Sequence, residues 1–128
     1  GSPSVYGDSI AGPECKEAEM ARWINIVESN CKDASREEEF NDWYDNIHLP
    51  DALETPGFVV ATRYLIGEPQ DGRGKYIAIY EIETDDFEQT MEVRRKVREV
   101  QYSQGRGSDL IESVSQVAYE MTAHRKST

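Results

Sequence analysis

The order of strand-like and helix-like segments is the feature that most constrains how this chain can fold. Residues 21–28, ARWINIVE, alternate between two faces with a period of two, which is typical of a strand. Later runs are rich in β-branched and aromatic residues, and stretches with apolar side chains at helical spacing lie between them. The expected elements, in chain order, are a strand at 21–28, a helix at 35–47, strands at 58–66 and 75–82, a helix at 84–100 and a strand at 113–124.

Capping and charge patterns set the boundaries of the two predicted helices. Ser35 stands three residues before Glu38 in a capping-box arrangement, and aromatic and aliphatic side chains then recur along one helical face. Pro50 either ends this helix or starts a short turn that runs through Leu53. Thr84 is the expected cap of the second helix, whose acids lie near its start and whose basic run RRKVRE lies toward its end, as the helix dipole favours.

This element order predicts an α+β fold. A βαββαβ chain folds as the ferredoxin-like motif, in which a four-stranded antiparallel sheet carries both helices on one face. The residues expected on the helix side are Ile24, Ile26, Ile77 and Ile79, and those expected on the open side are Trp23, Asn25, Val27, Tyr76, Ala78 and Tyr80. Because an open face rich in aromatic side chains is poorly suited to water, we expect a second sheet to cover it.

Length and charge narrow the class of protein. The chain has 128 residues, which suits one domain, and we expect that domain at 20–125, after a disordered extension at 1–19 and before a tail at 126–128. The formal net charge of -11 disfavours nucleic acid and membrane surfaces as partners. No apolar run approaches the roughly 20 residues that cross a bilayer. The expected location is therefore the cytoplasm, with Cys15 and Cys31 as free thiols.

One segment resembles a known family. Residues 39–64, EFNDWYDNIHLPDALETPGFVVATRY, are similar to the dimeric α/β barrel superfamily, especially its EthD-type branch. The features that carry the resemblance are Trp-Tyr at the end of the first helix, a histidine before Leu-Pro, and Pro-Gly-Phe before the second strand. Residues 22–125 follow the superfamily in element order. The resemblance implies a homodimer whose sheets pack face to face, with a small pocket in each subunit.

His48 is the leading candidate for proton transfer, since an imidazole titrates near neutral pH. It lies one helical turn beyond Tyr44, beside the apolar stripe, so we expect it to face a pocket. Asp45 and Asp51 flank it three residues away on each side, and either carboxylate could orient the imidazole and raise its pKa. The predicted catalytic residues are His48, Asp51 and Tyr44. The alternatives are a turn histidine, a solvated Asp45, an Asp51 that caps a turn, and a tyrosine that packs in the core.

Six further residues are predicted to bind the substrate: Trp23, Asn25, Trp43, Arg63, Tyr76 and Tyr80. Aromatic rings on the open face suit a flat ligand, although packing between subunits or in the core is the alternative for them. The arginine lies in a strand, where it either reaches an edge, pairs with a carboxylate such as Glu81, or meets an anionic group of the substrate. The basic run RRKVRE is interpreted as a solvated helix end with ion pairs to nearby glutamates.

The sequence contains no Gly-rich phosphate loop, His-Glu-x-x-His helix or Gly-x-Ser-x-Gly elbow, so we expect neither a metal nor an organic cofactor. Members of the superfamily include cofactor-free monooxygenases, polyketide cyclases, lactone isomerases and dehydratases. Our first hypothesis is an enzyme that uses general acid/base chemistry for cyclisation, dehydration, isomerisation or decarboxylation of a hydrophobic, aromatic or polyketide-like compound. The alternatives are a cofactor-free monooxygenase, a non-catalytic small-molecule-binding or stress-related dimer, and a subunit of a hetero-assembly.

Overall fold

The structure is a computed structural model that describes residues 20–128. The extension predicted at residues 1–19, with Cys15, lies outside the described residues. The elements in chain order are β2 (Ala21–Cys31), a 3-10 turn (Ala34–Arg36), α2 (Glu37–Trp43), a π-helical turn (Tyr44–His48), α3 (Leu49–Ala52), β3 (Phe58–Leu65), β4 (Tyr76–Thr84), α4 (Phe87–Ser103) and β5 (Ile111–Glu120).

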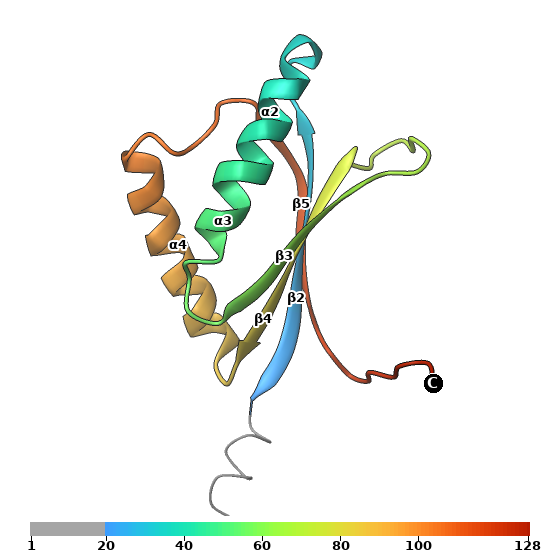
Figure 1. Ribbon diagram of the computed structural model, residues 1–128, viewed down its shortest axis with the longest axis vertical. Helices are drawn as coiled ribbons and strands as arrows, with labels where there is room; N and C mark the ends of the chain where they lie inside the picture. The colour runs from blue at the N-terminus through green and yellow to red at the C-terminus, as the bar shows by residue number, and fades with distance from the viewer. Residues whose placement is uncertain (1–19) are drawn as a thin grey trace, which may run out of the picture.

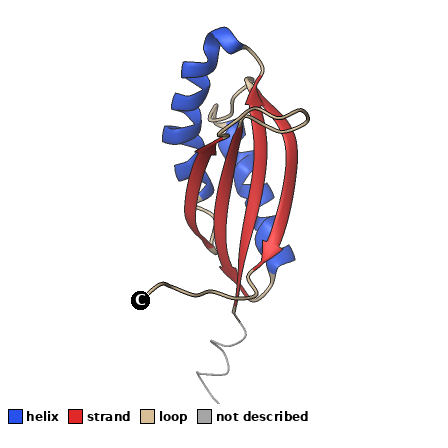
Figure 2. Cartoon of the chain, turned by 90° about the vertical axis from the view of Figure 1, so that its right-hand side faces the viewer, coloured by secondary structure: helices blue, strands red, loops and turns tan. Residues whose placement is uncertain are grey.

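The four strands form one antiparallel sheet in the order β3-β4-β2-β5. The central strands are β2 and β4, so Ile26 lies opposite both Ile79 on β4 and Val117 on β5. Both helical segments lie on one face of this sheet, and the other face is bare (Figure 1; Figure 2 shows the bare face). The predicted α+β fold, ferredoxin-like with a four-stranded antiparallel sheet, is confirmed.

The helices cover the face of the sheet opposite to the one predicted. On β4, the helix-facing side chains are buried, namely those of Tyr76, Ala78, Tyr80 and Ile82. The isoleucines expected there point to the bare face, where they are only partly buried: Ile24, Ile26, Ile77 and Ile79. The alternation identified correctly which residues share a face. It could not say which face the helices cover, because both sides of these strands are apolar.

Aromatic side chains of the first helical segment determine which face is covered. Phe40 is fully buried and packs on the ring of Tyr76, with ring centroids 6.0 Å apart. The Tyr76 hydroxyl donates a hydrogen bond to the carboxylate of Glu37 and accepts one from Asn41, both on α2. A buried tyrosine needs such a partner for its hydroxyl, and the helix supplies two. The tyrosine face of β4 is thus complementary to α2 in both shape and hydrogen bonding.

Pro50 does not end the first helical segment. The chain passes from α2 through the π-helical turn into α3, where Pro50 occupies one of the first two positions. Because Pro50 has no N–H group, it cannot donate the usual hydrogen bond to the preceding turn, and the wider π-helical turn lies just before it. The amide of Leu49 bonds across the wide turn to the carbonyl of Tyr44. His48 therefore lies in a helical turn, directly before this junction.

Two aspartates, one capping the 3-10 turn before α2 and one capping α4, differ from the predicted caps. Asp33 Oδ1 accepts hydrogen bonds from the amide and the hydroxyl of Ser35, at 3.0 and 2.7 Å. At the second helix, Asp86 Oδ1 accepts from the amide of Gln89 at 3.1 Å, while Thr84 accepts from the amide of Asp86. A carboxylate caps a helix as well as a hydroxyl does. Each observed cap therefore lies two residues from the predicted one, with Asp33 in place of Ser35 and Asp86 in place of Thr84.

Substitution of Ile82 tests the assignment of the buried face. Ile82 is fully buried under the helices, so we expect Ile82→Ala to lower the free energy of unfolding by about 2–5 kcal/mol. Val100→Ala is the control, since this α4 side chain is 56% exposed and its loss should change stability by less than about 1 kcal/mol. Chemical denaturation measures both. Similar losses in the two variants would contradict the described core.

Candidate functional site

A cavity of about 360 Å³ lies between the helices and the covered face of the sheet. Its walls come from α4, the π-helical turn and all four strands, so it is assembled from segments far apart in the sequence. The lining residues are Asn25, Val27, Tyr44, His48, Phe58, Tyr80, Arg94, Arg98, Tyr102, Ile111, Ser113 and Gln116. Among the predicted site residues, the fold therefore gathers Asn25, Tyr44, His48 and Tyr80 around one cavity.

His48 is held between aromatic rings. The indole of Trp43 stacks on its imidazole, with centroids 4.7 Å apart and planes inclined by 23°. Tyr44 meets it edge to face at 5.0 Å. Burial lowers the pKa of His48 to about 4, and the charge of Arg94 acts in the same direction, whereas the charge of Asp51 opposes it. The imidazole is thus neutral at pH 7 and has a lone pair free to accept a proton.

The two aspartates that flank His48 in sequence are engaged elsewhere. Asp51 is buried and accepts a bidentate ion pair from Arg106, at 2.7 and 2.9 Å. Asp45 accepts from Arg63 at 2.8 Å. No His–Asp hydrogen bond forms at His48 within residues 20–128. The sequence predicted that a carboxylate would raise the pKa of His48, but both carboxylates pair with arginines and burial lowers this pKa.

Two tyrosine hydroxyls lie in the cavity wall. Tyr44 is 1% exposed, and its hydroxyl has no hydrogen-bond partner within the described chain. Tyr80 is also buried, on the neighbouring strand β4. Burial raises the pKa of both phenols, so both remain protonated at neutral pH. A buried hydroxyl without a partner costs free energy, and the hydroxyls of Tyr80 and Ser29 lie close enough to Tyr44 to oppose the effect of burial on its pKa.

Arg94 is the main site residue that the sequence analysis missed. It is 6% exposed and lines the cavity, together with Arg98 and Tyr102 from later turns of α4. The run RRKVRE was interpreted as solvated, yet Arg94 lies three residues after Met91 and therefore on the apolar face of the helix. That position within the apolar stripe was the signal that could have identified it.

The remaining predicted residues support the fold or the cavity from outside. Trp23 stacks on Phe87, with centroids 4.3 Å apart, and does not line the cavity. Trp43 lies behind His48 and donates its indole N–H to the carbonyl of Arg106 at 2.9 Å.

Arg63 also lies outside the cavity, over the rings of Tyr44 and Tyr76, at 4.2 and 4.6 Å. It pairs with Asp45 rather than with Glu81, the carboxylate named from the sequence, because its side chain points to the helix side of the sheet. Tyr76, hydrogen-bonded to α2, is part of the core. Arg63 thus packs on Tyr44 without lining the cavity itself, and Tyr76 supports Arg63.

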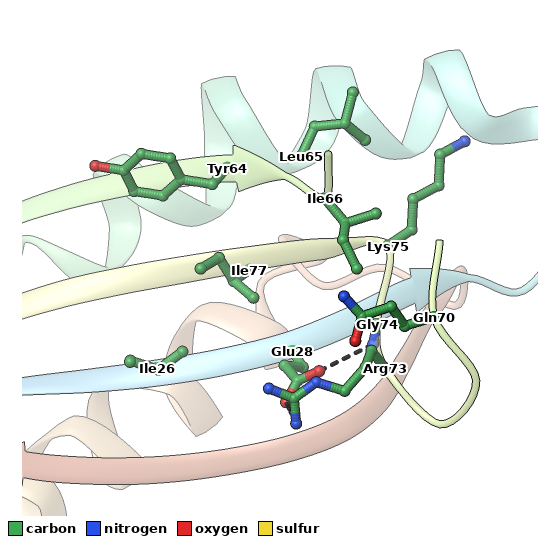
Figure 3. Close-up of a pocket in the computed structure, with 10 residues that line it drawn as sticks. All are labelled: Ile26, Glu28, Tyr64, Leu65, Ile66, Gln70, Arg73, Gly74, Lys75 and Ile77. Atoms are coloured by element: carbon green, nitrogen blue, oxygen red, sulfur yellow. Dashed lines mark hydrogen bonds and ion pairs between the residues drawn. The ribbon is translucent and has the colours of Figure 1, made fainter. Parts of the chain in front are cut away.

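A second hollow, of about 370 Å³, lies on the bare face of the sheet (Figure 3). The connection between β3 and β4 bounds it, and Ile26 and Ile77 form its floor. Its acidic group is already satisfied, because the Glu28 carboxylate accepts from the amide of Gly74 at 2.9 Å and from the hydroxyl of Ser115 at 2.7 Å. These bonds lower the pKa of Glu28. The group anchors the loop, and the first cavity is the better candidate for chemistry.

Within residues 20–128, no three or more histidine, cysteine, aspartate or glutamate side chains gather in a way that could hold a metal ion. No helix of this part of the chain combines the length and apolar character needed to span a membrane.

Comparison with known proteins shows that a solved structure shares this fold. No family model and no curated protein matches the chain. Among solved structures, HapK from Hahella chejuensis superposes with a TM-score of 0.56 at 14% identity, over 83% of this chain and 98% of HapK. The chain therefore shares the fold of HapK. The predicted resemblance is thus confirmed at the level of the fold of one subunit, and at this identity the likeness extends no further.

Two other solved structures match with lower scores. An ethyl tert-butyl ether D (EthD) family protein from Bacillus halodurans has a TM-score of 0.48 at 16% identity, over 80% of this chain and 99% of its own. A NIPSNAP family protein of unknown function from Agrobacterium tumefaciens has a TM-score of 0.49 at 14% identity, over 84% of this chain and 91% of its own.

The pKa of His48 gives a direct test of the site. Its folded value of about 4 lies below the ordinary value of 6.5, so between these pH values only the unfolded chain binds the proton. Stability contributed by neutral His48 is therefore present above pH 6.5 and falls as the pH drops toward 4, by on the order of 3 kcal/mol. Histidine NMR titration measures the pKa, with His48→Gln assigning the signal. The same pH dependence of unfolding in both proteins would contradict the described burial.

Proposed function

We propose that the protein is a cofactor-free enzyme that performs general acid/base chemistry on a hydrophobic, aromatic or polyketide-like compound. The observation that carries the proposal is a neutral imidazole, His48, in the wall of a cavity that two protonated tyrosines, Tyr44 and Tyr80, also line. A base and a hydrogen-bond donor in such proximity are what a proton transfer next to a carbonyl needs. The fold supports this proposal only as a scaffold, because one fold hosts many activities.

The roles of the residues follow from their protonation states. His48 accepts a proton from the substrate, and a phenol of the cavity wall donates a hydrogen bond to the oxygen on which charge develops. Apolar side chains, including Phe58 and Ile111, exclude water from the reacting groups. Cyclisation, dehydration, isomerisation and decarboxylation all pass through such a charged oxygen, so the arrangement suits each of them.

We also propose that the functional form is a homodimer whose sheets pack face to face. The bare face carries large apolar side chains that are exposed in the single chain, among them Val60, Tyr64, Val117 and Tyr119. An exposed apolar surface of this kind is typical of an interface. Loss of water from this face would stabilise the dimer in proportion to the apolar area that it buries.

One observation favours a second function, that of a non-catalytic small-molecule-binding dimer. A histidine base is usually oriented by a carboxylate or carbonyl partner. His48 makes no hydrogen bond with residues 20–128, and Asp51 is occupied by Arg106. Aromatic packing against Trp43 and Tyr44 orients the imidazole, which is sufficient for a residue that only binds a ligand.

Turnover measurements separate the two functions. A panel of aromatic and polyketide-like compounds is incubated with the wild type, His48→Ala and His48→Gln, and products are detected by mass spectrometry. We expect turnover by the wild type and a loss of about 10²–10⁴-fold in both variants, the range that a general base contributes. Turnover that survives in both variants would remove His48 from the mechanism. Ligand retention without turnover of any compound would favour the binding function.

Analytical ultracentrifugation tests the dimer. We expect the wild type to sediment as a dimer and Ile79→Lys to sediment as a monomer, because a lysine in the middle of the bare face would be buried without a partner. Val100→Lys is the matched control, since this side chain is exposed on α4, and it should remain dimeric. A monomeric wild type, or a dimeric Ile79→Lys, would count against sheet-to-sheet packing.

A further inference from the structure

Arg94 is a buried arginine without a carboxylate partner. Its side chain is 6% exposed, and its hydrogen bond within the described chain is from Nη1 to the neutral side-chain oxygen of Gln101, at 3.2 Å. Gln101 is itself held by the carbonyl of Asp51, to which it donates at 2.9 Å. A buried charge is costly unless an opposite charge compensates it. Nothing in residues 20–128 supplies that opposite charge by direct contact.

Other arginines of the fold have the carboxylate partner that Arg94 lacks. Arg106 forms a bidentate ion pair with Asp51, and Arg95, the next residue after Arg94, pairs with two glutamates on its own helix. Asp51 is the buried carboxylate whose charge reaches Arg94, but both of its oxygens are taken by Arg106. The guanidinium of Arg94 therefore faces the cavity with its charge uncompensated.

The wall around Arg94 contains a second cation. Arg98 adds its positive charge to the lining, one helical turn after Arg94. Tyr44 also lines the cavity, but its hydroxyl is itself buried and lies close to the hydroxyls of Tyr80 and Ser29. Two cations around one cavity are notable in a chain whose net charge is -11. Both would be stabilised by contact with a negatively charged oxygen.

We propose that the cavity binds a planar apolar acid whose carboxylate pairs with Arg94. The planar fork of an arginine matches the two oxygens of a carboxylate, and the burial of Arg94 strengthens the pair by limiting its contact with water. The apolar body then lies against Phe58 and Ile111, toward His48. This inference rests on the proposed function only in taking the same cavity as the ligand site, and it holds for a substrate or a merely bound ligand.

Binding of a matched acid and amide tests the inference. The probes are 2-naphthoate and 2-naphthamide, which have nearly the same shape and differ in charge, measured by calorimetry in 0.15 M salt. We expect the wild type to bind the acid at least tenfold more tightly than the amide, and Arg94→Gln to bind the two about equally. Arg95→Gln is the matched control, because it removes the same charge from the exposed face of α4, and it should retain the preference for the acid.

Several results would overturn the inference. They are equal binding of acid and amide by the wild type, no binding of either probe at millimolar concentration, and a preference for the acid that survives in Arg94→Gln. Unchanged binding of the amide verifies that Arg94→Gln is folded. If this variant does not fold, the comparison of acid and amide binding by the wild type tests the inference. Arg94→Lys, which retains charge without the fork, should retain only part of the preference.

The outcomes also separate this inference from the proposed enzyme. A preference for the acid without turnover of any compound supports the anion site and counts against catalysis. Turnover of neutral compounds alone, with no preference for the acid, supports catalysis and counts against the anion site. His48→Ala should leave the ratio of acid to amide affinity within about twofold of the wild type, because the ratio depends on Arg94.

Discussion

The packing of α2 on the tyrosine face of β4 is the interaction on which the rest of the structure depends. Phe40 enters the core over Tyr76, and Glu37 and Asn41 satisfy the hydroxyl that this packing buries. Because the face of β4 that carries Tyr76 also carries Tyr80, the same choice turns both tyrosines inward and the isoleucines outward. The polar cavity on one side and the bare apolar surface on the other are therefore two results of one packing event.

The covered side of the sheet is not an optimal hydrophobic core. It contains Asn25, a tyrosine hydroxyl without a partner and an arginine without a carboxylate, each of which is costly to bury. These three residues line a single cavity, whereas the other buried polar atoms without a partner in the described chain belong to Ser29, Thr55 and Arg63, which do not line it. Proteins tolerate such costs mainly at functional sites, which is why the cavity deserves more weight than the hollow on the other face.

His48 depends on a chain of contacts that begins outside the cavity. The loop after α4 supplies Arg106, whose guanidinium holds Asp51 and whose carbonyl accepts the indole N–H of Trp43. Trp43 in turn stacks on the imidazole. Asp51 thus acts on His48 through the packing of this loop, without a direct hydrogen bond. A site supported in this way keeps its geometry because its neighbours are locked by packing and ion pairs.

The sequence by itself determined the order of the elements, the period of each strand and, through these, the ferredoxin-like fold. It also named Asn25, Tyr44, His48 and Tyr80 as candidate site residues, although it placed Asn25 and Tyr80 on the open face of the sheet rather than under the helices. Only the tertiary structure decided which face of the sheet is covered and that Arg94 lies inside it. Both depend on surfaces brought together from distant parts of the chain, and a period of two is the same whichever side is buried.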